Sequence, residues 1–544
     1  MDHQRPVNRP AWRDALGLAA LGLLLFGWRL GGHDLWPTDE PRFALVAREM
    51  WERGDPVVLS LNNHLYTEKP PLFFWAVNAF AHLTGGVGEV AARLPSVLSA
   101  ILALLLIRRL GEILYDRPTG WLGAVIFATS IQILERARWA SIDMTLNLFV
   151  LAAILLLWSG TRDEARGRIG IVVAWGSMAC ATLAKGPVGL VLPLLALAPA
   201  LVVTSGWRSL RRLVPLSGVV VYLAVVLAWF VPFALRIGPG EAMGILTHQT
   251  VERYVDAWNA QHPIWYFLWQ FPVGFFPWSV FLPWAVHWSL QRSQSAEERR
   301  SAIVLVCWIA AIFLFFSLST GKRGVYIIPL YPAAALLVAR MFRCSEPAAG
   351  ALREEPPAGL RAAFGAWAVV AAAAAGAIAV VLPRRHAELR GASFLAATIL
   401  LFAAFLALLL ARRGRPVGAA LAVGGALAGM LFVCTERVVP WANAHLNLSG
   451  FAGEVRAALR DDAPLAATKE KRDAWVFYTG RFVEEVDSRE QVLAYLAGPP
   501  PRDLIIEDEF LARIRGDLPE AVREVVRGRV SGRPYHLLRL EAVP

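Results

Sequence analysis

Long stretches of apolar, nearly uncharged sequence recur along this chain, and they constrain its fold more than any other feature. Hydrophobic residues make up 56% of its 544 residues, which is more than a soluble protein of this length uses. A helix needs about 20 apolar residues to cross about 30 Å of hydrocarbon, and the shorter stretches reach this length with their flanks. A backbone in lipid must satisfy its own polar groups, so each stretch is predicted to be a membrane-spanning helix. The stretches are Leu94–Ile107, Gly120–Leu134, Leu146–Trp158, Ile169–Ala184, Pro187–Thr204, Val214–Leu235, Ala302–Leu318, Val325–Ala339, Ala362–Leu382, Ala392–Ala411 and Val417–Val433.

Two further segments, Ala15–Trp28 and Trp265–Trp288, bring the predicted count to about thirteen spans. The first of them is short enough to be a signal peptide. However, no small-residue cleavage pattern follows it, and Gly31 and Gly32 lead directly into a polar loop, so it is predicted to be an uncleaved helix. The predicted fold is therefore an α-helical polytopic membrane protein, whose odd number of spans puts its two ends on opposite sides.

Short loops rich in arginine alternate with longer loops that are not. The positive-inside rule places the arginine-rich set, together with the N-terminus, in the cytoplasm, and the C-terminus on the external side. The net charge of +11 is explained by this set, so no nucleic-acid partner is predicted. The set comprises Arg5, Arg9 and Arg13 at the N-terminus, then Arg108, Arg109, Arg117, Arg162, Arg166, Arg168, Arg208, Arg211, Arg212, Arg292, Arg299, Arg300, Arg340, Arg343, Arg353, Arg361, Arg412, Arg413 and Arg415.

Three regions interrupt the hydrophobic pattern on the external side: loop 31–93, loop 236–262 and the tail from about residue 440. In the first loop, Pro41–Arg53 has apolar residues at helical spacing and is predicted to be an amphipathic helix lying in the membrane interface. A second such helix is predicted over Tyr66–Phe80, opened by Pro70 and Pro71.

The tail has a different composition, because long apolar runs stop there. Strands are predicted at Trp475–Tyr478, Leu504–Glu507 and Tyr535–Leu540, and helices at Gly450–Arg460 and Glu490–Ala497. Residues 1–439 are therefore predicted to form a membrane domain with the two external loops, and residues 440–544 a small α/β domain outside the membrane.

Six groups of charged and polar residues fall on the external side by the same alternation. One acidic pair beside a membrane is most simply a hydrated loop, but six groups at one face outline a polar cavity. The excess of Lys and Arg among them suits an anionic ligand such as a phosphate. Glu40, Tyr66 and Lys322 are candidates for substrate binding as members of these groups. The groups are Asp39-Glu40-x-Arg42, Tyr66–Pro71, Glu135 to Asp143, Lys185-Gly186-Pro187, His248-x4-Arg253 with His262, and Ser319 to Tyr326.

In this order the motifs resemble those of the lipid A aminoarabinose transferases, within the protein O-mannosyltransferase-like (GT-C) superfamily of membrane glycosyltransferases. The matching segments run from Asp-Glu-x-Arg at Asp39, through Tyr-x-Glu-Lys-Pro-Pro at Tyr66, to Phe315–Pro329, and they extend to Lys471-Arg472-Asp473 in the tail. The resemblance implies about thirteen membrane helices with a periplasmic α/β domain, in the inner membrane of a bacterium. It implies an enzyme that moves a sugar from a polyprenyl-phosphate carrier to lipid A.

The resemblance also implies roles for individual residues. Asp39 matches the catalytic carboxylate after the first helix, and Asp143 matches a second acidic position in the cavity and is the second candidate for a catalytic residue. Arg42, Lys69, Arg253 and Tyr326 match the groups that hold the donor phosphate, and Lys185 matches another cavity lysine. Glu68 and His248 match the ligands of a divalent metal ion such as zinc, magnesium or manganese. Related enzymes can carry a second histidine two residues after the first, where this chain has Thr250.

The chemistry of such a transfer agrees with these residue types. Breaking a sugar–phosphate bond builds positive charge on the sugar and negative charge on the leaving phosphate. Fixed cations stabilise the phosphate, while a carboxylate can deprotonate an acceptor hydroxyl or stabilise the developing cation. No convincing glycine-rich phosphate loop is present, which also favours a lipid-linked donor over a nucleotide sugar.

Two alternatives stay open at this point. The chain could instead pass a mannose or another hexose to protein or to lipopolysaccharide. It could also be a transporter of a lipid-linked sugar, since polar residues among many helices can line a pathway. Transporters often have paired halves with broken helices near the midplane, and the sequence gives no sign of such pairing, so an enzyme is favoured.

Overall fold

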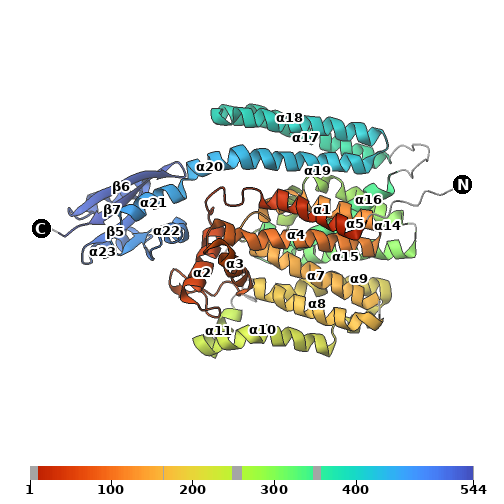
Figure 1. The fold of residues 1–544 in the computed structure, drawn as a ribbon, viewed down its shortest axis with the longest axis horizontal. Coiled ribbons are helices and arrows are strands. Elements are labelled where there is room, and N and C mark those ends of the chain that lie inside the picture. Colours follow the sequence, from red (N-terminus) through yellow and green to blue (C-terminus); the bar gives the residue numbers. More distant parts are fainter. Residues whose placement is uncertain (1–9, 163, 248–259, 294, 347–356, 543–544) are drawn as a thin grey trace. The chain divides into compact units, whose positions relative to one another are not determined.

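The computed structural model describes residues 10–162, 164–247, 260–293, 295–346 and 357–542. Its elements are labelled as in Figure 1. The chain divides into two compact units. The membrane unit consists of Met1–Trp28, Glu68–Phe73 and Pro95–Cys434, and the tail unit consists of Arg29–Thr67, Phe74–Leu94 and Thr435–Pro544. The tail unit thus contains the predicted tail domain and also most of the first external loop.

Long apolar helices dominate the membrane unit. Among the described residues, 10 helices are long and apolar enough to cross a membrane, so the prediction of a polytopic helical membrane protein is confirmed. They correspond to α4 (Glu89–Leu114), α7 (Ile142–Arg162), α8 (Glu164–Lys185), α9 (Val188–Ser205), α10 (Leu216–Ile237), α15 (Ala296–Leu318), the short helix Gly324–Leu330 continued by α16 (Tyr331–Cys344), α17 (Ala358–Arg385), α18 (Arg390–Arg412) and α19 (Pro416–Val433).

The three other predicted spans are helical but interrupted. Helix α1 (Ala11–Gly22) continues into a π-helical turn at Leu23–Gly27. Helix α5 (Arg117–Ala128) stops before α6 (Ile131–Arg136), and a 3₁₀ turn separates α13 (Tyr266–Gly274) from α14 (Leu282–Gln291). Pro277 accounts for the last interruption, because proline lacks the N–H that continues a helix. The count of thirteen spans therefore stays a prediction.

The helices of the membrane unit differ greatly in burial. In the segment Gly324–Cys344, 83% of the apolar stretch is buried within the protein, whereas only 17% of the apolar stretch of α10 is buried. Helices α7, α8 and α9 lie side by side, and α17, α18 and α19 form a second group (Figure 1). An apolar helix that is exposed to this degree requires lipid around it, so α10 and α17 are lipid-facing, whereas α16 belongs to the protein interior.

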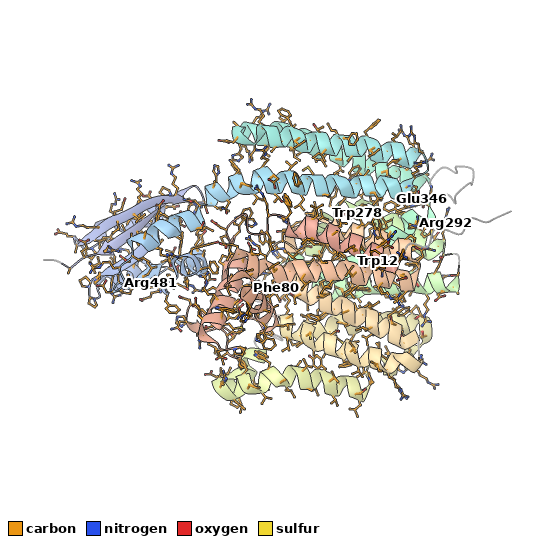
Figure 2. All side chains as sticks on the ribbon, viewed as in Figure 1. Trp12, Phe80, Trp278, Arg292, Glu346 and Arg481 are labelled. Carbon is orange, nitrogen blue, oxygen red and sulfur yellow. The ribbon has the colours of Figure 1, made fainter. Side chains whose placement is uncertain are left out.

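The arginine-rich loops meet at one end of the membrane unit. Arg340 forms ion pairs with Asp116, at 2.6 Å, and with Glu298, so the C-terminal part of α16 is joined to the starts of α5 and α15. Arg117 pairs with Asp14 at 2.5 Å. Figure 2 shows Arg292 and Glu346 at this same end, where the Glu346 carboxylate accepts the N–H of Val417 at the start of α19. Within the described residues, these contacts group in space several of the loops that the positive-inside rule groups together.

A five-stranded mixed sheet forms the core of the tail. Its strand order is β4-β3-β5-β7-β6; β3 is parallel to β4 and β5, and β7 is antiparallel to β5 and β6. Val492, Leu504 and Ile506 belong to the buried cluster beneath it. The elements are α21 (Leu448–Ala458), β3 (Leu465–Ala467), α22 (Arg472–Thr479), β4 (Val483–Glu485), α23 (Arg489–Leu496), β5 (Arg502–Glu507), α24 (Asp508–Ile514), β6 (Val522–Val530) and β7 (Arg533–Leu540).

Four of the five elements predicted in the tail are confirmed, and one is wrong. Strands β5 and β7 and helices α21 and α23 lie within two residues of their predicted starts. Trp475–Tyr478 was predicted as a strand because of its aromatic and β-branched residues, but it belongs to helix α22. Burial of Ala474, Trp475 and Phe477 in the tail unit overrides that local preference, and Gly480, at φ 71°, ends the helix.

The first external loop contains the two expected helices. Helix α2 (Asp39–Arg53) buries the predicted apolar face, Phe43, Val46, Ala47 and Met50. Helix α3 (Leu72–Thr84) begins directly after Pro70 and Pro71, six residues later than predicted. A two-stranded hairpin, β1 (Ser60–Leu61) with β2 (His64–Leu65), lies between them in the sequence.

Helices α4 and α5 approach so closely that two glycines are required. A Cβ atom on Gly120 would lie 2.1 Å from the carbonyl oxygen of Arg108, and one on Gly111 would lie 2.4 Å from the Cα atom of Gly120. Small residues let membrane helices approach in this way, and backbone atoms cannot move aside as a flexible side chain can.

Gly120→Ala is therefore expected to destabilise the membrane unit by about 1–3 kcal/mol or more, because the methyl group forces the two helices apart. Unfolding of the purified protein in detergent measures the change. Gly376→Ala is the matched control, since a Cβ atom at Gly376 in α17 meets nothing within 4 Å. Equal stability of the two variants would contradict the close approach.

Candidate functional site

The predicted site residues are shared between the two units. Asp39, Glu40, Arg42 and Tyr66 belong to the tail unit. The membrane unit holds Glu68, Lys69, Asp143, Lys185, Lys322 and Tyr326. His248 and Arg253 lie outside the described residues.

Three of the predicted residues come together at helix ends in the membrane unit. Asp143 lies in the first turn of α7, and Lys185 is the last residue of α8. Their side chains form a close ion pair, and the Lys185 ammonium lies 4.5 Å from the centre of the Tyr326 ring. Helix dipoles favour an acid at the start of one helix and a base at the end of the other. With exposed fractions of 16% and 17%, the pair remains accessible to a ligand.

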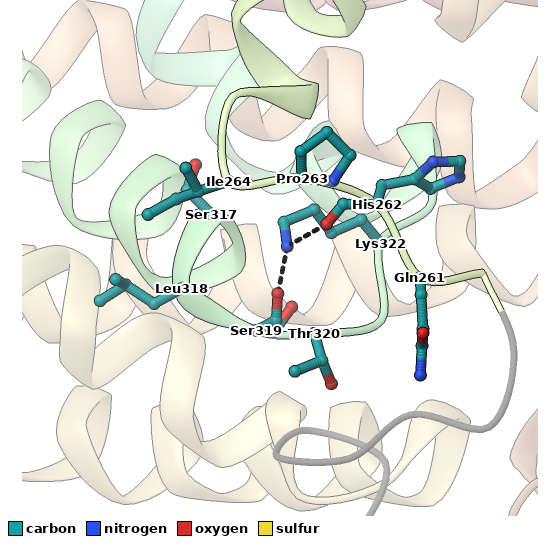
Figure 3. A pocket seen from close by; sticks show the side chains of 9 residues that line it. All are labelled: Gln261, His262, Pro263, Ile264, Ser317, Leu318, Ser319, Thr320 and Lys322. Carbon is teal, nitrogen blue, oxygen red and sulfur yellow. Dashed lines mark hydrogen bonds between the residues drawn. The ribbon is translucent and has the colours of Figure 1, made fainter.

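Lys322 has a different environment. Its ammonium group donates to the main-chain carbonyls of Ser319 and of His262, the latter at 2.9 Å (Figure 3). Its own N–H donates to the carbonyl of Ala260, and Gln261 pairs with Gly321. The side chain is 3% exposed, and burial lowers the pKa of this lysine. In this structure Lys322, predicted to bind substrate, fastens segment 260–262 to the loop that follows α15.

A cavity of about 500 Å³ lies beside this lysine. It opens between segment 261–264 and the end of α15 (Figure 3). The lining combines exposed apolar side chains, such as Ile264 and Leu318, with polar groups. The remaining lining residues are Gln261, His262, Pro263, Ser317, Ser319, Thr320 and Lys322.

Glu68 and Lys69 follow each other just before α3. The Lys69 ammonium donates to the carbonyl oxygen of Glu68 at 2.9 Å. In the part of the chain that the structure describes, no three His, Cys, Asp or Glu side chains lie close enough together to hold a metal ion. Of the two implied metal ligands, only Glu68 belongs to that part.

Glu40, adjacent to the predicted catalytic Asp39, is completely buried in the tail unit. Its two carboxylate oxygens accept the Nε and Nη2 groups of Arg93 at 2.8 and 3.0 Å, and neither side chain is exposed. Arg93 also donates to the carbonyl oxygens of Leu30, His33 and Asp34, at 2.7–3.0 Å. One guanidinium therefore fixes the segment that leads into α2 and its first residue, Asp39.

Arg42 and Tyr66 have partners within the tail unit as well. The Arg42 Nε group donates to Asp473 of α22 at 3.3 Å. Tyr66 is buried, and its ring meets that of Phe74 edge-on with centroids 5.9 Å apart. The fold thus holds Arg42 in the first turn of α2 and Tyr66 in the segment before α3.

Sequence reasoning missed Arg93, and it identified Asp473 only as part of a motif, without its partner in this region. A signal for Arg93 was present, because an arginine near the start of a membrane helix is costly without partners. Arg138 is a comparable case in the membrane unit. It donates to the carbonyl oxygens of Leu25 and Trp28, both at 2.9 Å, and so caps the end of the first helix. Nothing in the sequence signals the pairing of Asp473, which depends on the tertiary fold.

Comparisons with known proteins agree with this architecture. The profile of the family described as "Dolichyl-phosphate-mannose-protein mannosyltransferase" matches residues 68–231. The chain is 30% identical over 473 residues to the undecaprenyl phosphate-α-4-amino-4-deoxy-L-arabinose arabinosyl transferase of Pectobacterium carotovorum, covering 83% of this chain and 82% of that protein. A second such enzyme, from Pectobacterium atrosepticum, is 29% identical over 475 residues, with the same coverage of both chains.

Solved structures give the same fold. The structure of ArnT from Cupriavidus metallidurans bound to undecaprenyl phosphate superposes with a TM-score of 0.79 at 24% identity, covering 97% of this chain and 98% of that chain. The apo form of the same protein gives a TM-score of 0.80. These matches confirm the predicted fold class, a GT-C type helical membrane protein with a small tail domain.

The buried Arg93–Glu40 pair generates a stability prediction. Arg93→Met leaves the Glu40 charge buried without its guanidinium, which is expected to cost about 3–5 kcal/mol. The midpoint of unfolding in mixed detergent micelles measures the loss, and the double variant Arg93→Met/Glu40→Met should recover part of it. Arg513→Met removes an exposed pair with Glu509 and should change little. If Arg93→Met and Arg513→Met lose the same amount of stability, the Arg93–Glu40 pair does not hold the loop.

Proposed function

Since the chain belongs to the family of undecaprenyl phosphate-α-4-amino-4-deoxy-L-arabinose arabinosyl transferases, we propose that it transfers aminoarabinose from undecaprenyl phosphate to lipid A. The observation that carries the proposal is the identity of 30% with such an enzyme over 83% of this chain. The chain is a membrane glycosyltransferase, and the sugar, its carrier and its acceptor are the proposed part.

The geometry supports a reaction at a lipid-linked phosphate. Leaving-group stabilisation is usually the largest catalytic term in such reactions. We assign the donor phosphate to Arg42, Lys69, Arg253 and Tyr326. Lys185 is suited to the same anion, because it lies against Tyr326 and remains partly exposed. Asp143 holds Lys185 by its ion pair, so its proposed role is to orient that cation.

Asp39 is the proposed catalytic carboxylate. It is the first residue of α2 and is partly exposed, whereas its neighbour Glu40 is used by the buried Arg93. A carboxylate acts better on the acceptor or on the developing sugar cation than on the donor phosphate, because two anions repel each other. If the acceptor is a phosphate of lipid A, it is already anionic near neutral pH. Asp39 would then stabilise the sugar cation, with no proton to remove.

A specific observation favours a second candidate function. The family profile that matches residues 68–231 describes mannosyl transfer from dolichyl phosphate to protein. It covers less than a third of the chain, whereas the aminoarabinose transferase matches over most of it. Mannose transfer to protein is therefore the second candidate.

The proposed location is the inner membrane of a bacterium, with the N-terminus in the cytoplasm and the tail in the periplasm. The arginine-rich loops gathered at one end of the membrane unit support this orientation. The proposed acceptor, lipid A, would then reach the enzyme from the periplasmic leaflet of the inner membrane.

A divalent metal ion is also proposed, with Glu68 and His248 as protein ligands. A carboxylate and an imidazole suit zinc or manganese, but two protein ligands are fewer than a zinc site normally has. Substrate or water would complete the coordination. Activity of the purified enzyme is expected to fall after chelation and to return when zinc, manganese or magnesium is added. Unchanged activity after thorough chelation would show that the metal is dispensable.

The function itself is tested in cells that lack their own transferase but make the lipid-linked aminoarabinose. Expression of this chain should add an aminopentose to lipid A, seen by mass spectrometry. Asp39→Asn keeps the shape of the side chain and removes its charge, and the protein should still be made. Transfer should fall about 10²–10⁴-fold if Asp39 deprotonates an acceptor hydroxyl, and only modestly if the acceptor is a phosphate that needs no base. Lipid A without the sugar, together with a new hexose on envelope proteins, would support the second candidate instead.

A further inference from the structure

The motif Lys471-Arg472-Asp473 occupies the start of α22 in the tail, and its contacts connect the sheet to α2. The Lys471 ammonium donates to the hydroxyl of Tyr535, in β7, at 3.0 Å. Arg472 donates from Nε and Nη2 to one oxygen of Asp473, at 3.1 and 2.9 Å. The other oxygen of Asp473 accepts the Nε group of Arg42 at 3.3 Å. A carboxylate of the tail is thus shared by two arginines, one of which is a proposed ligand of the donor phosphate.

Other contacts hold α2 and the segments on either side of it against the tail independently of this ion pair. The guanidinium of Arg48 lies 3.6 Å from the centre of the Phe477 ring and donates to the carbonyl oxygen of the same residue. Asn62 both donates to and accepts from the backbone of Val483, at 2.7 and 3.0 Å. The Tyr478 hydroxyl accepts the N–H of Leu35 at 2.7 Å. Removal of the Asp473 charge should therefore leave the packing of α2 on α22 in place.

From this geometry we propose that Asp473 is a positioning residue for the donor site. Its carboxylate holds the Arg42 side chain in the orientation that binds the phosphate of the polyprenyl carrier. The inference rests on the proposed role of Arg42. It assigns to the tail domain a part in donor binding, through a single carboxylate.

The chemistry of arginine makes such an arrangement effective. A guanidinium presents five donors in a rigid plane, so a carboxylate on Nε fixes the direction in which the terminal nitrogens point. A long flexible side chain loses much rotamer freedom when it binds, and a partner that orders it beforehand lowers that loss. The negative charge of Asp473 does not repel the phosphate strongly, because Arg472 and Arg42 both neutralise it.

The test measures donor binding and turnover separately on the full-length protein in nanodiscs, with undecaprenyl phosphate as the binding probe. Asp473→Asn is expected to weaken binding about three- to tenfold and to raise the KM for the lipid-linked sugar equally. Its kcat at saturating donor should stay the same. Asp473→Glu keeps the charge and should restore most of the affinity.

A double-variant cycle shows whether Asp473 acts through Arg42. Arg42→Gln alone should weaken binding more than Asp473→Asn does, and adding Asp473→Asn to it should have no further effect. Asp517→Asn is the matched control, because Asp517 pairs with Arg489 on an exposed face of the tail, at 2.7 Å. It should bind the lipid phosphate as the wild-type protein does.

Three results would overturn the inference while leaving the proposed function intact. They are unchanged or tighter binding by Asp473→Asn, an additive loss in the double variant, and a fall in kcat without a change in KM. If the wild-type protein itself does not bind undecaprenyl phosphate, the proposed donor is wrong and the inference falls with it. Size-exclusion profiles and unfolding midpoints of all variants identify any that fail to fold. If Asp473→Asn is among them, Asp473→Ser replaces it, with the same expected weakening of binding and rise in KM.

Discussion

The structure depends on the pairing of charged side chains at the ends of its membrane helices. A charge near hydrocarbon is tolerated only when other groups replace the water it loses. Arg93 meets this requirement with one carboxylate and three carbonyl oxygens from the segment before α2, and Arg138 with two carbonyl oxygens at the end of the first helix. Lys185 meets it with Asp143. Each of these contacts joins segments that are distant in sequence, so the charges that membrane insertion makes costly also fix the loops that contain the proposed site residues.

The sequence predicted the architecture because membrane insertion is controlled by local properties. Apolar length and arginine distribution gave the helices and the grouping of the loops, and helical spacing gave α2 with Phe43 and Met50 on its buried face. The predictions were weaker where tertiary packing decides. Trp475 and Phe477 have strand preferences but lie in a helix, and interrupted helices such as α13 and α14 cannot be counted from hydropathy alone.

For the candidate site, sequence reasoning identified residue types better than residue partners. Asp143, Lys185 and Tyr326 were predicted as members of one cavity, and the structure brings them together. Lys322 came from the same reasoning, yet its ammonium is bound to main-chain carbonyls. The difference arises because a motif shows that a cation is present but not which acceptors the backbone offers to it. Asp473 illustrates the reverse case, since no local pattern shows that it meets an arginine about 430 residues earlier.

Helix geometry explains why the motif Asp39-Glu40-x-Arg42 contains two acids with different environments. Successive residues of a helix are rotated by about 100°, so positions 39 and 42 lie about 60° apart on one side, while position 40 points away from both. Glu40 faces inward and is completely buried with Arg93, whereas Asp39 and Arg42 are partly exposed. The buried acid fixes the helix start through its arginine, and the exposed acid and base remain accessible for chemistry. The spacing of the motif thus separates a structural carboxylate from the proposed catalytic one within a single turn, which is why a change at Glu40 and a change at Asp39 should affect different properties of the protein.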